Sequence, residues 1–149
     1  MPTLNREEIL KIIPHGTDAL ILDEICDYNL TPGSEFIIAK VTLSTDYSKI
    51  FEGHFPGFPV GPAHWQIEIG CLAATTLCAL IKGQLEQPIV LTELKKFKFR
   101  NYARPDDTLL VIIDEVKIKK QRIFDCKITL NNPTNNSLIC SGYVSGWLT

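Results

Sequence analysis

The chain has 149 residues, 45% of them hydrophobic, with a formal net charge of −2 and a sequence pI near 5.9. This length and apolar content fit one domain spanning residues 1–149, and the mildly acidic balance argues against general nucleic-acid binding. The longest apolar run, residues 69–81, is too short and too interrupted by threonine to span a bilayer, so we expect no membrane segment. No basic start followed by an apolar core is visible after Met1, so we expect no secretory signal.

The first third of the chain predicts a short helix followed by an antiparallel hairpin. Asn5 can cap a helix that ends before Pro14, because Asn accepts hydrogen bonds from free amides and the residue preceding proline disfavours helical geometry. Residues 19–29 and 35–43 are β-capable and are separated by a turn at residues 31–34. Residues 44–52 are predicted to form a polar loop.

A loop rich in glycine and proline, from Gly53 to Pro62, contains His54 and leads into an apolar segment that extends to about Ile81. Glu68 is the only carboxylate between Phe55 and Ile81, where no Lys or Arg occurs. The segment predicts a buried helix because it is apolar on nearly every side. A carboxylate there needs a raised pKa or a nearby partner. The separation of 14 residues between His54 and Glu68 allows the two side chains to meet across one cavity, within a subunit or between two.

The remaining chain predicts four strands, over residues 89–102, 108–119, 122–130 and 137–148. In the first of these, Phe97 and Phe99 alternate with charged residues, which predicts one buried and one solvated face. The order of short helix, two strands, long helix and four strands indicates an α+β domain, in which an antiparallel sheet wraps around one long central helix.

Five cysteines form an odd set without a Cys-x-x-Cys pair, and three separate histidines supply no metal-ligand spacing. Cys71 and Cys78 stand seven residues apart, so they share one face of the central helix. We therefore expect structural thiols in a reducing cytoplasm, with no metal and no bound cofactor.

The sequence Gly-His-Phe-Pro-Gly-x-Pro at residues 53–59, followed by Pro62 and Glu68, resembles the β-hydroxyacyl-acyl carrier protein dehydratases of type II fatty acid synthesis. These are 3-hydroxyacyl dehydratases with a hotdog fold. The similarity includes Pro14-His15 and the segments 20–23 and 99–107, so it covers most of the chain.

Three positions depart from the pattern of the resembled family. Gly16, Ala63 and Leu72 stand where that family commonly has Arg, Gly and Gln. These departures leave room for an accessory enzyme in a specialised acyl or polyketide pathway.

The resemblance implies dehydration of a 3-hydroxyacyl chain, linked through phosphopantetheine to an acyl carrier protein, to the trans-2-enoyl product. It implies that His54 removes the α proton and that Glu68 on the partner subunit's helix assists departure of the hydroxyl as water. It also implies a homodimer, or a hexamer of three dimers, in which two sheets join edge to edge.

Substrate contacts are expected from the loop, the helix start and aromatic walls, at Gly57, Phe58, Pro62, Ala63, His64, Trp65, Phe97 and Phe99. For the four aromatic residues, packing in the core is the plainer interpretation. Free amides at the helix start can hold the thioester carbonyl. A basic cluster comprises Lys95, Lys96, Lys98, Arg100 and Arg104. It predicts a docking surface for the acidic carrier protein or for the phosphate of its pantetheine arm. The plainer interpretation is a solvated face of the sheet.

Two other functions fit the same pattern. An acyl thioesterase on this fold would use Glu68 to activate water, and the intact His54 loop argues against it. A non-catalytic acyl-binding subunit would tolerate replacement of His54 and Glu68, and neither is replaced.

Overall fold

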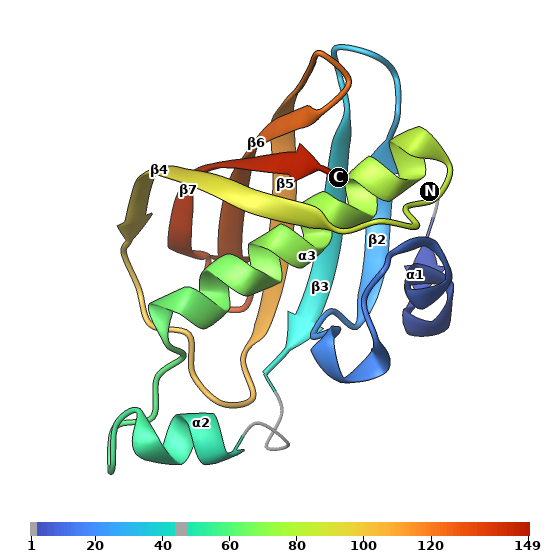
Figure 1. Cartoon of the computed structure of the whole chain (residues 1–149). Coiled ribbons are helices and arrows are strands. Elements are labelled where there is room, and N and C mark those ends of the chain that lie inside the picture. Colours follow the sequence, from blue (N-terminus) through green and yellow to red (C-terminus); the bar gives the residue numbers. More distant parts are fainter. Residues whose placement is uncertain (1–2, 44–47) are drawn as a thin grey trace.

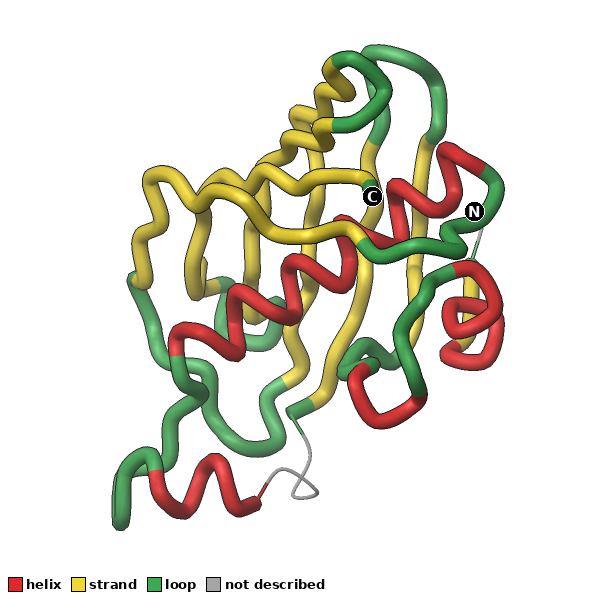
Figure 2. Tube along the Cα trace, in the orientation of Figure 1, coloured by secondary structure: helices red, strands yellow, loops and turns green. Residues whose placement is uncertain are grey.

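The computed structural model describes residues 3–43 and 48–149 (Figure 1). Its centre is the helix α3 (Ala63–Lys82), which lies across one face of a seven-stranded antiparallel sheet with the order β1-β2-β3-β5-β6-β7-β4. The strands are β1 (Leu4–Asn5), β2 (Glu24–Asn29), β3 (Phe36–Thr42), β4 (Ile89–Phe99), β5 (Thr108–Lys119), β6 (Ile123–Asn132) and β7 (Ser137–Leu148). Figure 2 shows the sheet curling around this helix, so the predicted α+β arrangement is confirmed.

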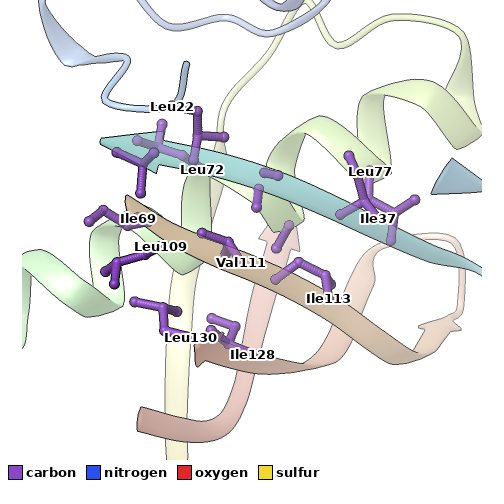
Figure 3. Packing of buried hydrophobic residues seen from close by; sticks show 14 of the residues in the cluster. Leu22, Ile37, Ile69, Leu72, Leu77, Leu109, Val111, Ile113, Ile128 and Leu130 are labelled. Atoms are coloured by element: carbon purple, nitrogen blue, oxygen red, sulfur yellow. The ribbon is translucent and has the colours of Figure 1, made fainter. Parts of the chain in front are cut away.

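The core lies between α3 and the inner face of the sheet. On β3, Ile37, Ala39 and Val41 are fully buried, whereas the alternate residues Ile38 and Lys40 are only half-buried on the outer face. Figure 3 shows apolar side chains of α3 packed against those of β3, β5 and β6. This packing fixes α3, and hence Glu68 on it, relative to the sheet.

One glycine lets α3 approach the sheet closely. A Cβ atom on Gly70 would lie 2.5 Å from Cγ2 and 2.7 Å from Cδ1 of Ile128, a fully buried residue of β6. Such distances leave no room for a side chain, so Gly70 sets the spacing between α3 and β6.

The N-terminal region contains the predicted helix, α1 (Arg6–Ile12), with Asn5 and Glu8 forming a capping box. The predicted strand over residues 19–29 is shorter, since β2 begins at Glu24 and a 3-10 turn, η1 (Thr17–Ala19), precedes it. The guanidinium of Arg6 donates to the carbonyls of Thr17 (2.8 Å) and Leu22 (3.2 Å). These carbonyls therefore bind a side chain rather than a neighbouring strand.

The predicted polar loop over residues 44–52 is partly helical. Residues 44–47 lie outside the described residues, and α2 (Ser48–Gly53) occupies the rest. Figure 1 shows α2 standing away from the sheet, beside the start of α3. This helix carries the chain directly into the loop that contains His54.

β4 contains a bulge that the sequence did not predict, and the side of the strand that bears its phenylalanines is only partly buried. The register shifts between Lys95 and Lys98, and Lys96 has a positive φ of 55°, which marks a bulge. Phe97 and Phe99 lie on the same side of β4, as the alternation predicts, with their ring centroids 6.1 Å apart. Phe99 is exposed, so the prediction that this side is buried is wrong at that residue. β4 forms one edge of the sheet and buries little of its surface.

The helix α3 is longer than the apolar run on which the no-membrane prediction rested. Its 20 residues and mean hydropathy of 1.2 meet the length and composition of a membrane-spanning helix. However, 67% of an 18-residue stretch of this helix is buried within the chain. Its apolar residues are therefore those of a core helix packed on a sheet.

Candidate active site

His54 lies at the start of a compact loop between α2 and α3. The loop is closed by two hydrogen bonds of 2.8 Å, from the Phe55 amide to the Phe58 carbonyl and from the Phe58 amide to the Phe55 carbonyl. Gly57 has a φ of +76°, which a side chain would disfavour. The rings of Phe55 and Phe58 are exposed, at 52% and 45%, so the loop offers apolar surface beside the histidine.

The imidazole of His54 is oriented by the backbone of its own loop. Its Nδ1 lies 3.0 Å from the carbonyl oxygen of Val60, and the Val60 amide donates to the His54 carbonyl at 2.8 Å. A carbonyl oxygen can only accept, so Nδ1 carries the proton and Nε2 of the neutral ring carries a lone pair. The ring of Phe55 stacks on the imidazole with centroids 4.2 Å apart. The loop therefore presents a preformed proton acceptor.

The loop is anchored where it joins α3. The Gly61 amide donates to the Ala103 carbonyl at 2.6 Å, and the side-chain amide of Gln66 donates to the Gly61 carbonyl at 3.2 Å. Pro62 precedes α3 and provides no side-chain cap, while Ala63 and His64 at the helix start are exposed. The first amides of α3 are thus available to an outside acceptor.

Glu68 lies in the second turn of α3, on the side of the helix that the sheet does not cover. His64 and Glu68 are exposed on this side, and Ile67 and Cys71 are half-buried, which corrects the expectation that Glu68 lies on a helix buried all round. Partial desolvation raises the pKa of Glu68, and the charge of His15 opposes that shift. The protonated form of Glu68 is thereby favoured.

His54 and Glu68 do not pair within the chain. Among the described residues Glu68 forms no ion pair, and the charge that acts on its pKa is that of His15 rather than His54. Of the two arrangements left open by the sequence, a pairing within one subunit is therefore not seen.

A small apolar cavity of about 50 Å³ lies one turn beyond Glu68, between α3 and β4, β6 and β7. Cys71 and Thr75 from α3 line it, with Leu91 of β4 and Phe124 of β6. Sequence reasoning did not single out Cys71 or Thr75 as lining residues. Their spacing of three and seven residues from Glu68 was the available signal, because it places all three on one stripe of a helix.

The predicted aromatic walls lie in three different surroundings. Trp65 is buried and packs edge-on against Phe51 of α2, with ring centroids 5.6 Å apart. Phe97 covers Gly142, where a Cβ atom would lie 2.4 Å from the Phe97 ring. Phe58 packs edge-on against the exposed ring of Tyr102 at 5.2 Å. Neither Phe97 nor Phe99 lines the small cavity.

The predicted basic cluster is spread along β4 and the segment after it. Lys95 pairs with Glu93 at 3.3 Å, and both Lys95 and Lys96 line a wide groove of about 1010 Å³ whose lining includes neither His54 nor Glu68. Lys98 and Arg100 are exposed near the end of β4. The guanidinium of Arg104 lies 5.8 Å from the centroid of the Tyr102 ring, which itself contacts Phe58. Arg104 is therefore connected to the His54 loop through Tyr102 and Phe58.

The cysteines are free thiols, and burial raises the pKa of Cys71 and Cys140 to about 12 and that of Cys78 to about 11. These thiols stay protonated at neutral pH, so they are poor nucleophiles and poor metal ligands. Within residues 3–43 and 48–149, no group of three or more His, Cys, Asp or Glu side chains is placed to hold a metal ion.

Comparison with known proteins agrees with the resemblance found in the sequence. Residues 31–142 match the model of the ApeI-like family, described as ApeI dehydratase. The 3-hydroxyacyl-[acyl-carrier-protein] dehydratase FabZ of Syntrophomonas wolfei is 36% identical over 118 residues, which cover 78% of each chain.

Solved structures confirm the hotdog fold. The dehydratase heterocomplex ApeI:P from Xenorhabdus doucetiae superposes with a TM-score of 0.76 at 11% identity, covering 95% of this chain and 90% of that one. Zebrafish thioesterase superfamily member 2 superposes with a TM-score of 0.65 at 12% identity, covering 91% and 88%. At such identities the likeness concerns the fold alone, whereas the matched sequence shows the family. The chain belongs to the ApeI-like dehydratase family.

Proposed function

We propose that this protein dehydrates 3-hydroxyacyl chains carried on an acyl carrier protein, giving the trans-2-enoyl product in the synthesis of fatty acids or related acyl chains. The observation that carries the proposal is the Nδ1 bond of His54 to the Val60 carbonyl, which leaves Nε2 free to accept a proton. The sequence relatives named 3-hydroxyacyl-[acyl-carrier-protein] dehydratase support the substrate class.

The reaction removes a proton from C2 and a hydroxyl from C3 of the acyl chain. Nε2 of His54 takes the C2 proton, the C2–H electron pair becomes the C2–C3 double bond, and the C3–O bond breaks. Glu68, whose raised pKa favours the acid form, gives its proton to the departing hydroxyl, which leaves as water. Exchange with solvent returns the imidazolium and the carboxylate to their starting states.

Negative charge grows on the thioester oxygen while the C2 proton is removed. The amides of Ala63 and His64 begin a 20-residue helix that has no side-chain cap, so they are suited to donate to that oxygen. The methyl group of Ala63 leaves its amide intact. Together with Gly57, Phe58 and Pro62, these residues form the proposed entrance for the thioester.

We place His54 of one subunit opposite Glu68 of a second copy of the chain. The support is that Glu68 lies on an uncovered face of α3, and that no strand in the described part of the chain pairs with the outer edge of β4. The simplest assembly is a homodimer, and three such dimers would form a hexamer. Of the solved neighbours, the Xenorhabdus dehydratase is itself a heterocomplex.

The carrier protein is proposed to dock near the His54 loop through Arg104, with Lys98 and Arg100 extending the positive surface along β4. Arg104 is favoured because it stacks on Tyr102 beside Phe58. Lys95 and Lys96 contribute charge from the bulge on β4. The free thiols of the described chain fit a reducing compartment such as the cytoplasm.

The test is turnover of a 3-hydroxybutyryl or crotonyl carrier-protein pair by the wild type and by His54→Ala and Glu68→Gln. We expect kcat/KM to fall at least about 100-fold in each variant, because each removes one proton-transfer group. Thr76→Val is the matched control, since it changes a buried residue of the same helix that does not line the small cavity and removes neither an acid nor a base.

Three outcomes would contradict the proposal. Release of free thiol in place of the enoyl product would make the protein a thioesterase. Binding of acyl carrier protein without turnover would make it a binding subunit. Full activity in either variant would remove that residue from the mechanism.

A further inference from the structure

Gln66 is a buried polar residue of α3 that the proposed reaction does not use. Its side chain is 4% exposed, and its Nε2 donates to the Gly61 carbonyl at 3.2 Å. Its Oε1 is buried and has no hydrogen-bond partner among the described residues. A buried amide that makes one hydrogen bond and leaves its own oxygen unpaired adds little to the stability of the fold. We therefore expect the role of Gln66 to lie in the position of the group that it binds.

The contacts of Gln66 lead to the carbonyl that orients His54. The Val60 carbonyl accepts from Nδ1 of His54, and the Gly61 amide of the same peptide group donates to the Ala103 carbonyl. The next peptide group has only the Gly61 carbonyl to offer, because Pro62 has no N–H. Gln66 donates to that carbonyl. Hydrogen bonds therefore fix two consecutive peptide groups, Val60–Gly61 and Gly61–Pro62, where the loop joins α3.

The same residue belongs to the helix that carries Glu68. The backbone amide of Gln66 donates to the Pro62 carbonyl at 3.2 Å, in the first turn of α3, and Glu68 follows two residues later. Gln66 therefore joins the support of His54 to the support of Glu68 through one side chain.

We infer that Gln66 is a positioning residue for the dehydration, which holds the Val60–Gly61 backbone so that His54 keeps its proton on Nδ1 and its Nε2 free. The inference rests on the proposed function of His54. Without the Gln66 bond, the Gly61 carbonyl turns to find another donor, the Val60 carbonyl moves with it, and the imidazole loses its fixed tautomer.

The experiment compares Gln66→Met, which keeps the volume and removes the donor, with Thr76→Val. Thr76 is a buried residue of the same helix whose hydroxyl donates to the Leu72 carbonyl at 2.8 Å, so this control loses a similar bond far from the loop. We expect kcat of Gln66→Met to fall about tenfold or more with KM changed less than about twofold, because misplacement affects chemistry more than binding. Thr76→Val should keep kcat within about twofold.

A second readout follows the tautomer directly, by ¹⁵N NMR of histidine-labelled protein at about pH 9, with His54 assigned through His54→Gln. The wild type and Thr76→Val should show Nδ1 protonated, and Gln66→Met should show a mixture of tautomers. An unchanged tautomer or an unchanged kcat in Gln66→Met overturns the inference.

Two further results keep the test decisive. If Gln66→Met does not fold, Gln66→Glu replaces it, because only a protonated carboxyl can donate to Gly61; its activity relative to the wild type should rise as the pH falls, and a constant ratio overturns the inference. A wild type without turnover refutes the proposed function, whereas the tautomer shift still decides whether Gln66 orients His54.

Discussion

At the scale of single residues, the carboxyl of Glu68 is stabilised in its acid form although it is exposed in the isolated chain. Desolvation by neighbouring atoms raises its pKa, and the charge of His15 only partly offsets that effect. A second subunit covering this face would remove further water and favour the acid form more strongly. The surroundings of Glu68 thus suit proton delivery rather than ion pairing.

This shift has a consequence for stability that Glu68→Gln tests. Because the pKa in the folded state lies above the ordinary value of 4.5, ionising Glu68 opposes folding, and this loss grows as the pH rises from the ordinary pKa through the folded one. We expect Glu68→Gln to be more stable than the wild type at about pH 8 and equally stable at about pH 4, in urea unfolding at one protein concentration.

Glu24→Gln is the control with the opposite sign. A hydrogen bond from Lys40, at 2.7 Å, holds the pKa of Glu24 below its ordinary value, so its contribution is present above that value and is lost as the pH falls. Glu24→Gln should therefore be less stable than the wild type at about pH 8. Equal stability of wild type and Glu68→Gln at both pH values would contradict the assigned shift.

The sequence predicted the site residues whose type is unusual for their surroundings. It missed the residues whose role depends on a tertiary contact. His54 in a glycine-rich loop and Glu68 in an apolar segment are unusual for their surroundings, so both were visible. Gln66 donates to the carbonyl of Gly61, a loop residue that is held near α3 by the hydrogen bond of its amide to Ala103. Thr75 lines a cavity that residues of three separate strands complete. These roles depend on tertiary contacts that the pattern of residue types does not contain.

At the scale of elements, the distance between α3 and β6 depends on Gly70. Gly70→Ala would place a methyl group 2.5 Å from Cγ2 of Ile128, which is fully buried, so Ile128 or the helix must shift. We expect a net destabilisation of about 1–3 kcal/mol, even though alanine favours helix formation by about 1 kcal/mol. Thermal or urea unfolding measures it.

Gly16→Ala is the matched control. Its Cβ atom would have nothing within 4 Å and its φ is −80°, so we expect a change within about 0.5 kcal/mol. If the two alanine variants unfolded alike, the close approach at Gly70 would not determine the packing of α3.

Elements with a strong repeating pattern were predicted almost to the residue, and irregular ones were not. α3, β5 and β7 follow the predicted bounds because their apolar positions repeat over many residues. The start of β2 was missed because Arg6 donates to the carbonyls of Thr17 and Leu22, which precede the strand. These two contacts join residues 11 and 16 positions apart, so the local pattern does not contain them. The bulge at Lys96 on β4 was not predicted, since nothing in the residue types requires a positive φ there.

At the scale of the whole molecule, the described chain leaves apolar surface uncovered at one edge of the sheet and at the His54 loop. β4 exposes apolar side chains at Val90, Leu91 and Leu94 along a sheet edge with which no described strand pairs, and the His54 loop exposes Phe55 and Phe58. Residues of β4 and of α3, the helix that carries Glu68, both line the small apolar cavity. A second copy of the chain that pairs with β4 would cover this sheet edge and the exposed side of α3. It would also bring a second His54 loop.

The most direct test of this account mixes two inactive variants, His54→Ala and Glu68→Gln, under conditions that exchange subunits. If each site takes His54 from one chain and Glu68 from the other, half of the dimers are mixed and each contains one intact site, so we expect about a quarter of wild-type activity. Mixing His54→Ala with the double variant supplies no intact site and should stay inactive. Activity no greater than that of the separate variants would contradict a site shared between two chains.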